Sequence, residues 1–581
     1  MNRHLLLSAA FCLALAPTPA FATDGPVPHT GFNENIPIQM MGDELDRPIA
    51  MVIEDRLTTP KKLKKIENEF GSAGAKVLTR SYAGRLYRPI WTEVGAESLQ
   101  GVVDNLFDHG IVSDQILRND LRRTIKSRFT SKSPKSRAKA DIQLSLAWLR
   151  TAKAIGGGLK DEGGMATPMK IGVKKFNLTD SLLQSGLGKS STELFAMAPN
   201  THDYQKLIAA LATYRELAAN GGWRGIPEGD AIEVGDKDPR VPALRTRLRA
   251  EGFYDLEQLL RSPDADIAID VLDENTVIAL KKFQRRHGLN EDGILGNNTL
   301  KAMNESVESK IDKISDALHR WRYQGDMGQK YIWANIPSYT ATGWNRGKKE
   351  ITMRTIVGKP RFATPEFSDQ VEYMVANPKW YLPVSIIRRQ KVPKLKRDPG
   401  YADKYGYNIY DRKTGEKVDA YSVDWTERGV ARKYRFVQEA GEGNALGDMK
   451  IIFPNQYSVY LHGTPGEHLF EKAQRAFSSG CVRLEDPVRM AKWIARHDDE
   501  VARTDITEAI EETENTRFEL DEHVPVHITY FLVTANDDGS VNFHRDIYKR
   551  DDGIRTVKKM AKLYKPKPTT VGAHLDGESA H

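Results

Sequence analysis

The spacing of hydrophobic residues changes near residue 330, and this change limits the folds open to the chain. Before it, apolar residues recur at helical intervals, for example over residues 207–214. After it, residues 331–336 and 351–357 alternate and are rich in aromatic and β-branched side chains, which is typical of strands. Because 581 residues are too many for one hydrophobic core, the sequence predicts a multidomain α+β protein with a helical first half and a β-rich last domain.

The N-terminus has the features of an export signal. A basic start at Arg3 and His4 precedes an apolar run over residues 5–16 and a small-x-small cleavage site at residues 20–22. The run is short for a membrane span, although an uncleaved anchor is the alternative. We therefore expect an exported protein whose mature chain begins near Thr23 and has no transmembrane segment.

Composition and loop-forming residues divide the rest of the chain. Hydrophobic residues make up 40% and charged residues 28% of the sequence, as in soluble globular proteins, and the net charge is +7. Basic runs are usually solvated faces, and export argues against nucleic acid as a partner. The expected segments are a signal peptide at 1–22, a mobile leader at 23–60, a helical scaffold at 61–231, a compact unit at 232–305, a linking helix at 306–329, a β-rich domain at 330–550 with an insertion at 378–433, and a basic tail at 551–581.

The compact unit at 232–305 contains three short helical patterns. Val241, Leu244 and Leu248 form the apolar stripe of the first, and the second ends near Gly288. A generic three-helix bundle would explain this spacing. The motifs that go beyond it are Val241-x-x-Leu244-Arg245-x-x-Leu248, Phe283-Gln284-x-x-x-Gly288-Leu289 and Asp292-Gly293-x-Leu295-Gly296-x-x-Thr299. Together they resemble the three-helix peptidoglycan-binding module that is appended to many wall enzymes.

The sequence contains two cysteines, Cys12 in the signal and Cys481, so the mature chain has one thiol and no internal disulfide. A lone cysteine is usually a small buried hydrophobe. Here, however, small residues at 478–480 precede Cys481 and allow a tight turn in which main-chain N–H groups could bind an oxyanion. Asp486 and Pro487 then fit the start of a helix, whose N-terminal end would favour the thiolate if the geometry brings it close.

A strand is expected at residues 456–462, with Tyr460 and His462 on one face and Val459 and Leu461 in the core. A thiol is only slightly ionised at neutral pH, so an imidazole that accepts its proton raises its reactivity. His462 is the best candidate for this role, although a lone histidine on a strand is more often structural.

The assignment of His462 and Cys481 as a catalytic pair is supported by a wider resemblance to a known family. His462, followed by Ser-x-Gly-Cys-x-Arg at 478–483, is similar to the L,D-transpeptidase family. The motifs Asn335-Ile336-Pro337, Trp380-Tyr381-Leu382-Pro383, Asp424-Trp425, Asn444-Ala445-Leu446-Gly447-Asp448-Met449-Lys450 and Pro454-Asn455 resemble its large Gram-negative branch. The resemblance covers most of residues 200–550. It implies a helical scaffold, a peptidoglycan-binding module and a YkuD-like catalytic domain with a substrate-capping insertion.

The resemblance also implies a role for individual residues. Cys481 would be the acylated nucleophile, His462 its general base, and the backbone carbonyl of Gly463 would orient the imidazole. Backbone amides at Gly480 and Cys481 would form part of the oxyanion hole. The residues that would line the site are Tyr460, Ser478, Ser479, Arg483, Trp380 and Trp425.

Two positions depart from the family pattern. Ser479 stands where many relatives have histidine, which leaves only one obvious imidazole. Gly463 stands where the large branch commonly has an acidic residue, which bears on acceptor binding.

The implied reaction consists of two acyl transfers on peptidoglycan in the periplasm. Cys481 would attack the third residue of a tetrapeptide donor, usually diaminopimelate, and expel D-alanine. The amine of a second diaminopimelate would then attack the thioester and give a 3-3 cross-link. The insertion would close over the donor. No cofactor and no metal are expected, because His and Cys do not occur at zinc-like spacing, and the sequence identifies no protein partner.

Three other functions remain open at this stage. A carboxypeptidase or endopeptidase would use the same thioester with water as the acceptor. A papain-like protease would have its histidine after the cysteine, whereas here it comes before. A non-catalytic wall-binding protein would not need Cys481 at all.

Overall fold

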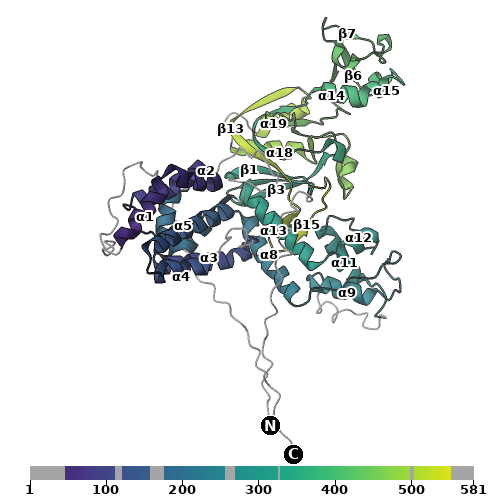
Figure 1. Cartoon of the computed structure of the whole chain (residues 1–581). Coiled ribbons are helices and arrows are strands. Elements are labelled where there is room, and N and C mark those ends of the chain that lie inside the picture. Colours follow the sequence, from purple (N-terminus) through teal and green to yellow (C-terminus); the bar gives the residue numbers. More distant parts are fainter. Residues whose placement is uncertain are drawn as a thin grey trace, which may run out of the picture.

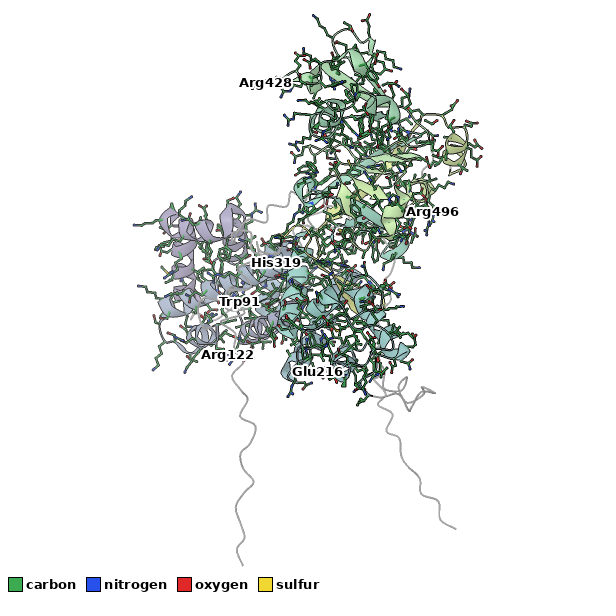
Figure 2. All side chains as sticks on the ribbon, turned by 90° about the vertical axis from the view of Figure 1, so that its right-hand side faces the viewer. Trp91, Arg122, Glu216, His319, Arg428 and Arg496 are labelled. Carbon is green, nitrogen blue, oxygen red and sulfur yellow. The ribbon has the colours of Figure 1, made fainter. Side chains whose placement is uncertain are left out.

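The computed structural model describes residues 46–111, 121–157, 176–254, 269–324, 327–497 and 503–550. The N-terminal helices lie on one side of a strand-rich region, and a smaller subdomain projects from that region (Figure 1). In Figure 2, Arg428 marks the end with the projecting subdomain and Glu216 the opposite end of the molecule. The predicted signal peptide at 1–22 and basic tail at 551–581 lie outside the described residues.

The scaffold helices pack around a buried polar centre as well as an apolar core. The carboxylate of Asp141, fully buried, accepts hydrogen bonds from Arg128 Nε at 2.6 Å and the Tyr82 hydroxyl at 2.8 Å. The backbone N–H groups of Ile90 and Trp91 also donate to it, so the buried charge has several partners. The elements are α1 (Arg47–Thr58), α2 (Pro60–Ala83), α3 (Glu93–Asn105), η3 (Leu106–His109), α4 (Leu121–Thr130), α5 (Pro134–Gly157), α6 (Leu178–Gln184), η5 (Ser185–Lys189), α7 (Ser190–Phe195) and α8 (His202–Ala219).

The mobile leader predicted at 23–60 is wrong over its last part, and residues 23–45 lie outside the described residues. α1 buries Ile49, Ile53 and Leu57 against the other scaffold helices. Pro48 stands in the first turn of α1, and Pro60 begins α2. Proline is well tolerated at these positions because its missing N–H would have no partner there. These prolines therefore start helices and do not mark an irregular segment.

The compact unit consists of α9 (Val241–Ala250), α11 (Glu274–Arg286) and α12 (Asn297–Met303). Its predicted apolar stripes meet in one core, in which Leu244, Leu248, Leu280 and Phe283 are fully buried. α11 ends just before Gly288, whose φ of +59° lies in the left-handed region that favours glycine after a helix.

The segment expected as a linking helix, 306–329, contains α13 (Val307–Gln324), which is part of the scaffold's packing. Ile314, Leu318 and Trp321 are buried in the same core as the scaffold helices. A C-terminal hairpin of β14 (Val533–Ala535) and β15 (Val541–Phe543) also packs into this core. Helices and strands from both ends of the chain therefore share one apolar interior.

The β-rich domain is built on a nine-stranded sheet with the order β11-β3-β12-β10-β9-β4-β13-β1-β2, and β2 also pairs with β3, so the sheet closes on itself. The strand β13 ends at Thr529, and Val533 begins the separate hairpin. α18 packs on β9 and α19 on β4. The elements of this domain are β1 (Lys330–Asn335), β2 (Thr340–Asn345), β3 (Lys348–Gly358), η6 (Pro360–Phe362), β4 (Phe367–Ala376), β9 (Met449–Ile452), β10 (Leu461–His462), η9 (Glu467–Glu471), β11 (Ala476–Ser478), β12 (Val482–Leu484), α18 (Pro487–Ile494), η10 (Ala495–His497), α19 (Arg503–Glu511) and β13 (Thr516–Thr529).

The capping insertion has its own four-stranded sheet, β5-β8-β6-β7, and its own core, in which Ile387, Leu395 and Phe436 are fully buried. Because β8 lies inside this sheet, the insertion extends to Gln438, beyond the predicted end at 433. Its elements are β5 (Trp380–Tyr381), α14 (Val384–Ile386), η7 (Ile387–Lys391), α15 (Val392–Leu395), α16 (Tyr401–Lys404), β6 (Tyr407–Asp411), β7 (Lys417–Val418), η8 (Ala420–Ser422), α17 (Val430–Lys433) and β8 (Tyr434–Gln438).

The compact unit meets the scaffold at a buried ion cluster. The carboxylate of Glu251 lies 2.6 Å from Lys310 Nζ of α13 and 2.6 Å from Arg247 of α9. The Tyr214 hydroxyl of α8 donates to it at 2.6 Å, and His287 Nε2 lies 2.9 Å from Lys310 Nζ. Burial by itself would raise the pKa of Glu251, but Lys310 and Arg247 outweigh this effect and hold the pKa at about 2. The carboxylate therefore stays charged inside the junction.

Replacing Glu251 by glutamine tests this junction. In Glu251→Gln the charges of Lys310 and Arg247 remain buried without a counter-charge, so we expect denaturant unfolding to show a free energy lowered by about 3–5 kcal/mol. Glu291→Gln is the matched control, because Glu291 forms an exposed pair with Arg285 in the same unit at 2.7 Å; its effect should stay below about 1 kcal/mol. Equal effects of the two substitutions would contradict the role of the cluster.

Candidate active site

The strand that leads to His462 is shorter than predicted. β10 contains only Leu461 and His462, and residues 456–460 form a loop. The side chain of Asn455 stabilises this loop by accepting hydrogen bonds from the backbone N–H groups of Tyr457 and Val459. Ser458 has a φ of +55°, which is incompatible with a continuous strand.

Parallel pairing of β10 with β12 brings the two predicted catalytic residues into one site. Leu461 is in register with Val482 and His462 with Arg483, and the Val482 N–H donates to the Tyr460 carbonyl at 3.3 Å. Side chains alternate along a strand, so Tyr460, His462, Cys481 and Arg483 project from the same face of the sheet. The rings of Tyr460 and His462 are 5.4 Å apart. The predicted common face is therefore present although most of the predicted strand is not.

His462 is buried and neutral. Its Nδ1 donates to the carbonyl oxygen of Gly463 at 2.6 Å, which leaves Nε2 as the proton acceptor. Burial, reinforced by the charge of Arg483, lowers the pKa of His462 to about 3. A side chain at position 463 would meet Leu446 O and Pro487 Cγ at 3.1 Å. This close packing favours glycine at position 463.

The loop before Cys481 is held by three hydrogen bonds. Ser478 Oγ donates to the carbonyl of Cys481 at 2.6 Å and accepts from the N–H of Gly480 at 3.1 Å. Thr364, which the sequence analysis missed, donates to the carbonyl of Gly480 at 2.8 Å. Gly480 has a φ of +129°, a conformation that only glycine adopts readily.

These contacts decide which amide is available to an oxyanion. The N–H of Gly480 is already bound to Ser478, so its predicted oxyanion role would require that hydrogen bond to break. The N–H of Cys481 has no acceptor among the described residues. It points away from the Gly480 carbonyl that Thr364 holds, because the peptide group is planar and trans. The Cys481 N–H is thus the better-placed donor.

The Cys481 thiol is not activated in the way expected from the sequence. α18 begins six residues later, after β12, with Asp486 as its N-cap. Burial raises the pKa of Cys481 above its ordinary value of 9.0. This shift is opposed by a hydrogen bond from the Tyr460 backbone and by the positive charges of Lys450 and Arg483. Cys481 Sγ lies 3.8 Å from the carbonyl oxygen of Ser458. The resting thiol is therefore protonated.

Lys450 is a site residue to which the sequence analysis gave no role. It lies on β9 in register with His462, and its Nζ is 4.4 Å from the centroid of the Tyr460 ring. Burial lowers the pKa of Lys450, while the charge of Cys481 raises it. The strand alternation over 449–452 indicates which face it occupies, but the pairing of β9 with β10 could not be read from the sequence.

The capping insertion touches the site at two points. Gln390 Nε2 of η7 donates to Ser479 Oγ at 2.8 Å, so Ser479 connects the loop before Cys481 to the insertion. Burial raises the pKa of Tyr460 well above its usual range, and the side chain of Trp380 opposes this shift, so Trp380 lies near the Tyr460 hydroxyl. Trp425 is only 3% exposed and lies in the core of the insertion, where its Nε1 donates to the Ala420 carbonyl. The geometry gives its predicted contact with substrate no support.

Comparison with known families agrees with this arrangement. Residues 329–519 match the profile "L,D-transpeptidase catalytic domain", residues 237–303 "Putative peptidoglycan binding domain" and residues 76–211 "Scaffold domain". The chain belongs to the L,D-transpeptidase family. The matched catalytic domain lies in the β-rich domain that contains Cys481 and His462, and the matched peptidoglycan-binding domain is the three-helix unit.

Two curated proteins are similar to parts of this chain. The "Putative L,D-transpeptidase" of Haemophilus influenzae is 37% identical over 165 residues, which is 28% of this chain and 33% of the relative. The "N-acetylmuramoyl-L-alanine amidase CwlM" of Mycobacterium tuberculosis is 32% identical over 79 residues, 14% of this chain and 20% of the relative. The chain thus spans a third or less of each of these relatives.

Solved structures with some likeness include L,D-transpeptidases at low identity. The Xylanimonas cellulosilytica L,D-transpeptidase is 13% identical, covers 52% of this chain and 98% of its own, and has a TM-score of 0.15. The Mycobacterium smegmatis L,D-transpeptidase is 13% identical, covers 35% and 58%, and also has a TM-score of 0.15. At these scores the family assignment depends on the sequence profiles.

The described residues contain no helix with the length and apolarity needed to span a bilayer. In the same residues, no three His, Cys, Asp or Glu side chains gather in a group that could hold a metal ion.

The protonation states of the site predict how Cys481 reacts with pH. Because the thiol pKa is raised and His462 stays neutral down to about pH 3, no thiolate–imidazolium pair forms at neutral pH. We expect alkylation by iodoacetamide to accelerate continuously through about pH 9. A chain that begins at Thr23 contains only this cysteine, so the rate reports on Cys481 alone. A plateau between about pH 5 and pH 8 would show that the ion pair does exist.

Proposed function

We propose that the protein is a periplasmic L,D-transpeptidase that forms 3-3 cross-links between peptidoglycan stem peptides through a thioester on Cys481. The observation that carries this proposal is the pairing of β10 with β12, which sets a neutral His462 and Cys481 on one face of the catalytic sheet. The peptidoglycan-binding module and the export signal inferred from residues 1–22 are consistent with an enzyme of the cell wall.

In the first step, Cys481 Sγ attacks the carbonyl carbon of the third residue of a tetrapeptide stem. Because the resting thiol is protonated, His462 Nε2 accepts its proton during the attack. The N–H of Cys481 stabilises the oxyanion. The bond to the terminal D-alanine then breaks, the amine leaves with the proton from His462, and a thioester remains.

In the second step, the side-chain amine of a diaminopimelate on a neighbouring stem attacks the thioester. His462 Nε2 takes a proton from this amine and returns it to the sulfur as the C–S bond breaks. The products are a 3-3 cross-link and the free thiol. The Gly463 carbonyl keeps the imidazole in the required tautomer through both steps.

Contacts of the capping insertion favour transfer to an amine over transfer to water. Gln390 donates a hydrogen bond to Ser479, two residues before the nucleophile, and Trp380 lies near Tyr460 on the face that carries His462. A cap that is fixed at both points restricts water around the thioester. The carboxypeptidase and endopeptidase alternatives, in which water is the acceptor, require a more open site.

Mass spectrometry of muropeptides tests the proposed function directly. The mature protein, incubated with tetrapeptide stems, should release D-alanine and form a 3-3 dimer, and Cys481→Ala should do neither. Formation of tripeptide monomer alone would identify a hydrolase. Absence of turnover with retained binding to peptidoglycan would identify a wall-binding protein.

The contact between the insertion and the site loop predicts a change in product ratio. Gln390→Ala removes the hydrogen bond to Ser479, so we expect a larger share of hydrolysed tripeptide relative to 3-3 dimer, by a factor of roughly 2–10 for a bond of about 1 kcal/mol. The ratio is measured by chromatography of the same muropeptide reaction. Arg388→Ala, an exposed position in the same helical segment, is the control and should leave the ratio unchanged.

A further inference from the structure

Two cations stand on either side of His462 in the catalytic sheet. His462 of β10 is in register with Lys450 of β9 and with Arg483 of β12. Residues in register on neighbouring strands project from the same face, with their Cβ atoms about 4.5–5.5 Å apart. A row across three strands is therefore formed by Lys450, His462 and Arg483. Tyr460 and Cys481 lie two residues before His462 and Arg483, on the same face of the sheet.

Neither cation has a carboxylate partner among the described residues. The recorded contact of Lys450 is the ring of Tyr460, and Arg483 has a buried Nε without a hydrogen-bond partner. Two other buried cations are neutralised by carboxylates: Arg128 contacts Asp141, and Lys310 contacts Glu251. Buried Lys391 has no such partner but donates a hydrogen bond to the Tyr407 hydroxyl. Burying a charge without a partner costs several kcal/mol, so such groups are retained where a ligand completes them.

The position of the row limits what that ligand can be. Both Lys450 and Arg483 act on the charge of Cys481, so an anion that they bind lies close to the sulfur. In a tetrapeptide donor, the carboxylate next to the bond that Cys481 breaks is that of the terminal residue, which is expelled. A carboxylate accepts hydrogen bonds from both an ammonium and a guanidinium group.

We propose that Lys450 and Arg483 form an anion subsite that binds the terminal carboxylate of the donor stem. This inference rests on the proposed function, because it names the feature of the donor that the same site recognises. In this subsite, Lys450 and Arg483 both determine specificity for the donor stem. A donor whose fourth residue continues into a further peptide bond has no carboxylate at this point and binds less well.

Binding to an inactive protein tests the subsite without requiring turnover. Isothermal titration calorimetry compares two synthetic tetrapeptides, with a free C-terminal carboxylate or a C-terminal amide, on the full mature chain with Cys481→Ala. We expect the acid to bind about tenfold to hundredfold more tightly than the amide, as for a hydrogen bond to a charged group. Adding Lys450→Met or Arg483→Gln should remove most of this preference. Lys359→Met, an exposed lysine beside the same loop, is the control and should retain it.

Three results would overturn the proposal. The first is equal affinity for acid and amide in Cys481→Ala. The second is a preference that survives both substitutions. The third is discrimination that follows amidation of the side-chain carboxylate of the third residue, which would assign the subsite to a different group. A preference for the acid together with no release of D-alanine by the unmodified enzyme would support the subsite and reject the proposed function, so the two failures are distinguishable.

Discussion

The parallel alignment of β10 with β12 is the constraint on which the site depends. It involves few residues, and neighbouring contacts fix it. The carboxylate of Glu485, just after β12, accepts from the Arg354 backbone N–H at 3.0 Å and from Arg354 Nε at 2.9 Å, which ties β12 to β3. Asp486 then caps α18 by accepting from the Arg489 N–H at 2.9 Å. A slip of one residue would turn Cys481 and His462 to opposite faces, so these capping and pairing contacts preserve the chemistry.

Burial moves three groups of the site toward their neutral forms. It raises the pKa of Cys481 and lowers the pKa values of His462 and Lys450. The resting site therefore carries less charge than its residue types suggest. Charge develops when a substrate provides an anion or when a proton moves from sulfur to imidazole. This arrangement keeps the Cys481 thiol protonated and weakly nucleophilic until a donor is bound.

The sequence predicted local features well and distant contacts poorly. The cap of α18 was predicted because Asp486 and Pro487 are adjacent and their preference for a helix start is local. The common face of Tyr460 and His462 was predicted from alternation alone. Thr364 and Lys450 were missed because only the closed sheet brings them to Cys481. The helix at 47–58 was missed because its prolines were interpreted as loop signals. The end of α18 was expected to favour the thiolate if it lay close to the sulfur, but β12 separates Cys481 from this helix.

The buried cluster around Glu251 gives the peptidoglycan-binding module, the compact three-helix unit, a fixed position. Lys310 belongs to the helix that leads into the catalytic sheet, and Glu251 and Arg247 belong to the module, so the two parts share charged groups in a closed interior. The module is therefore not joined to the rest of the protein by a flexible linker. The fold therefore sets the distance and direction from this module to Cys481, so a ligand bound by the module would have a fixed position relative to the nucleophile.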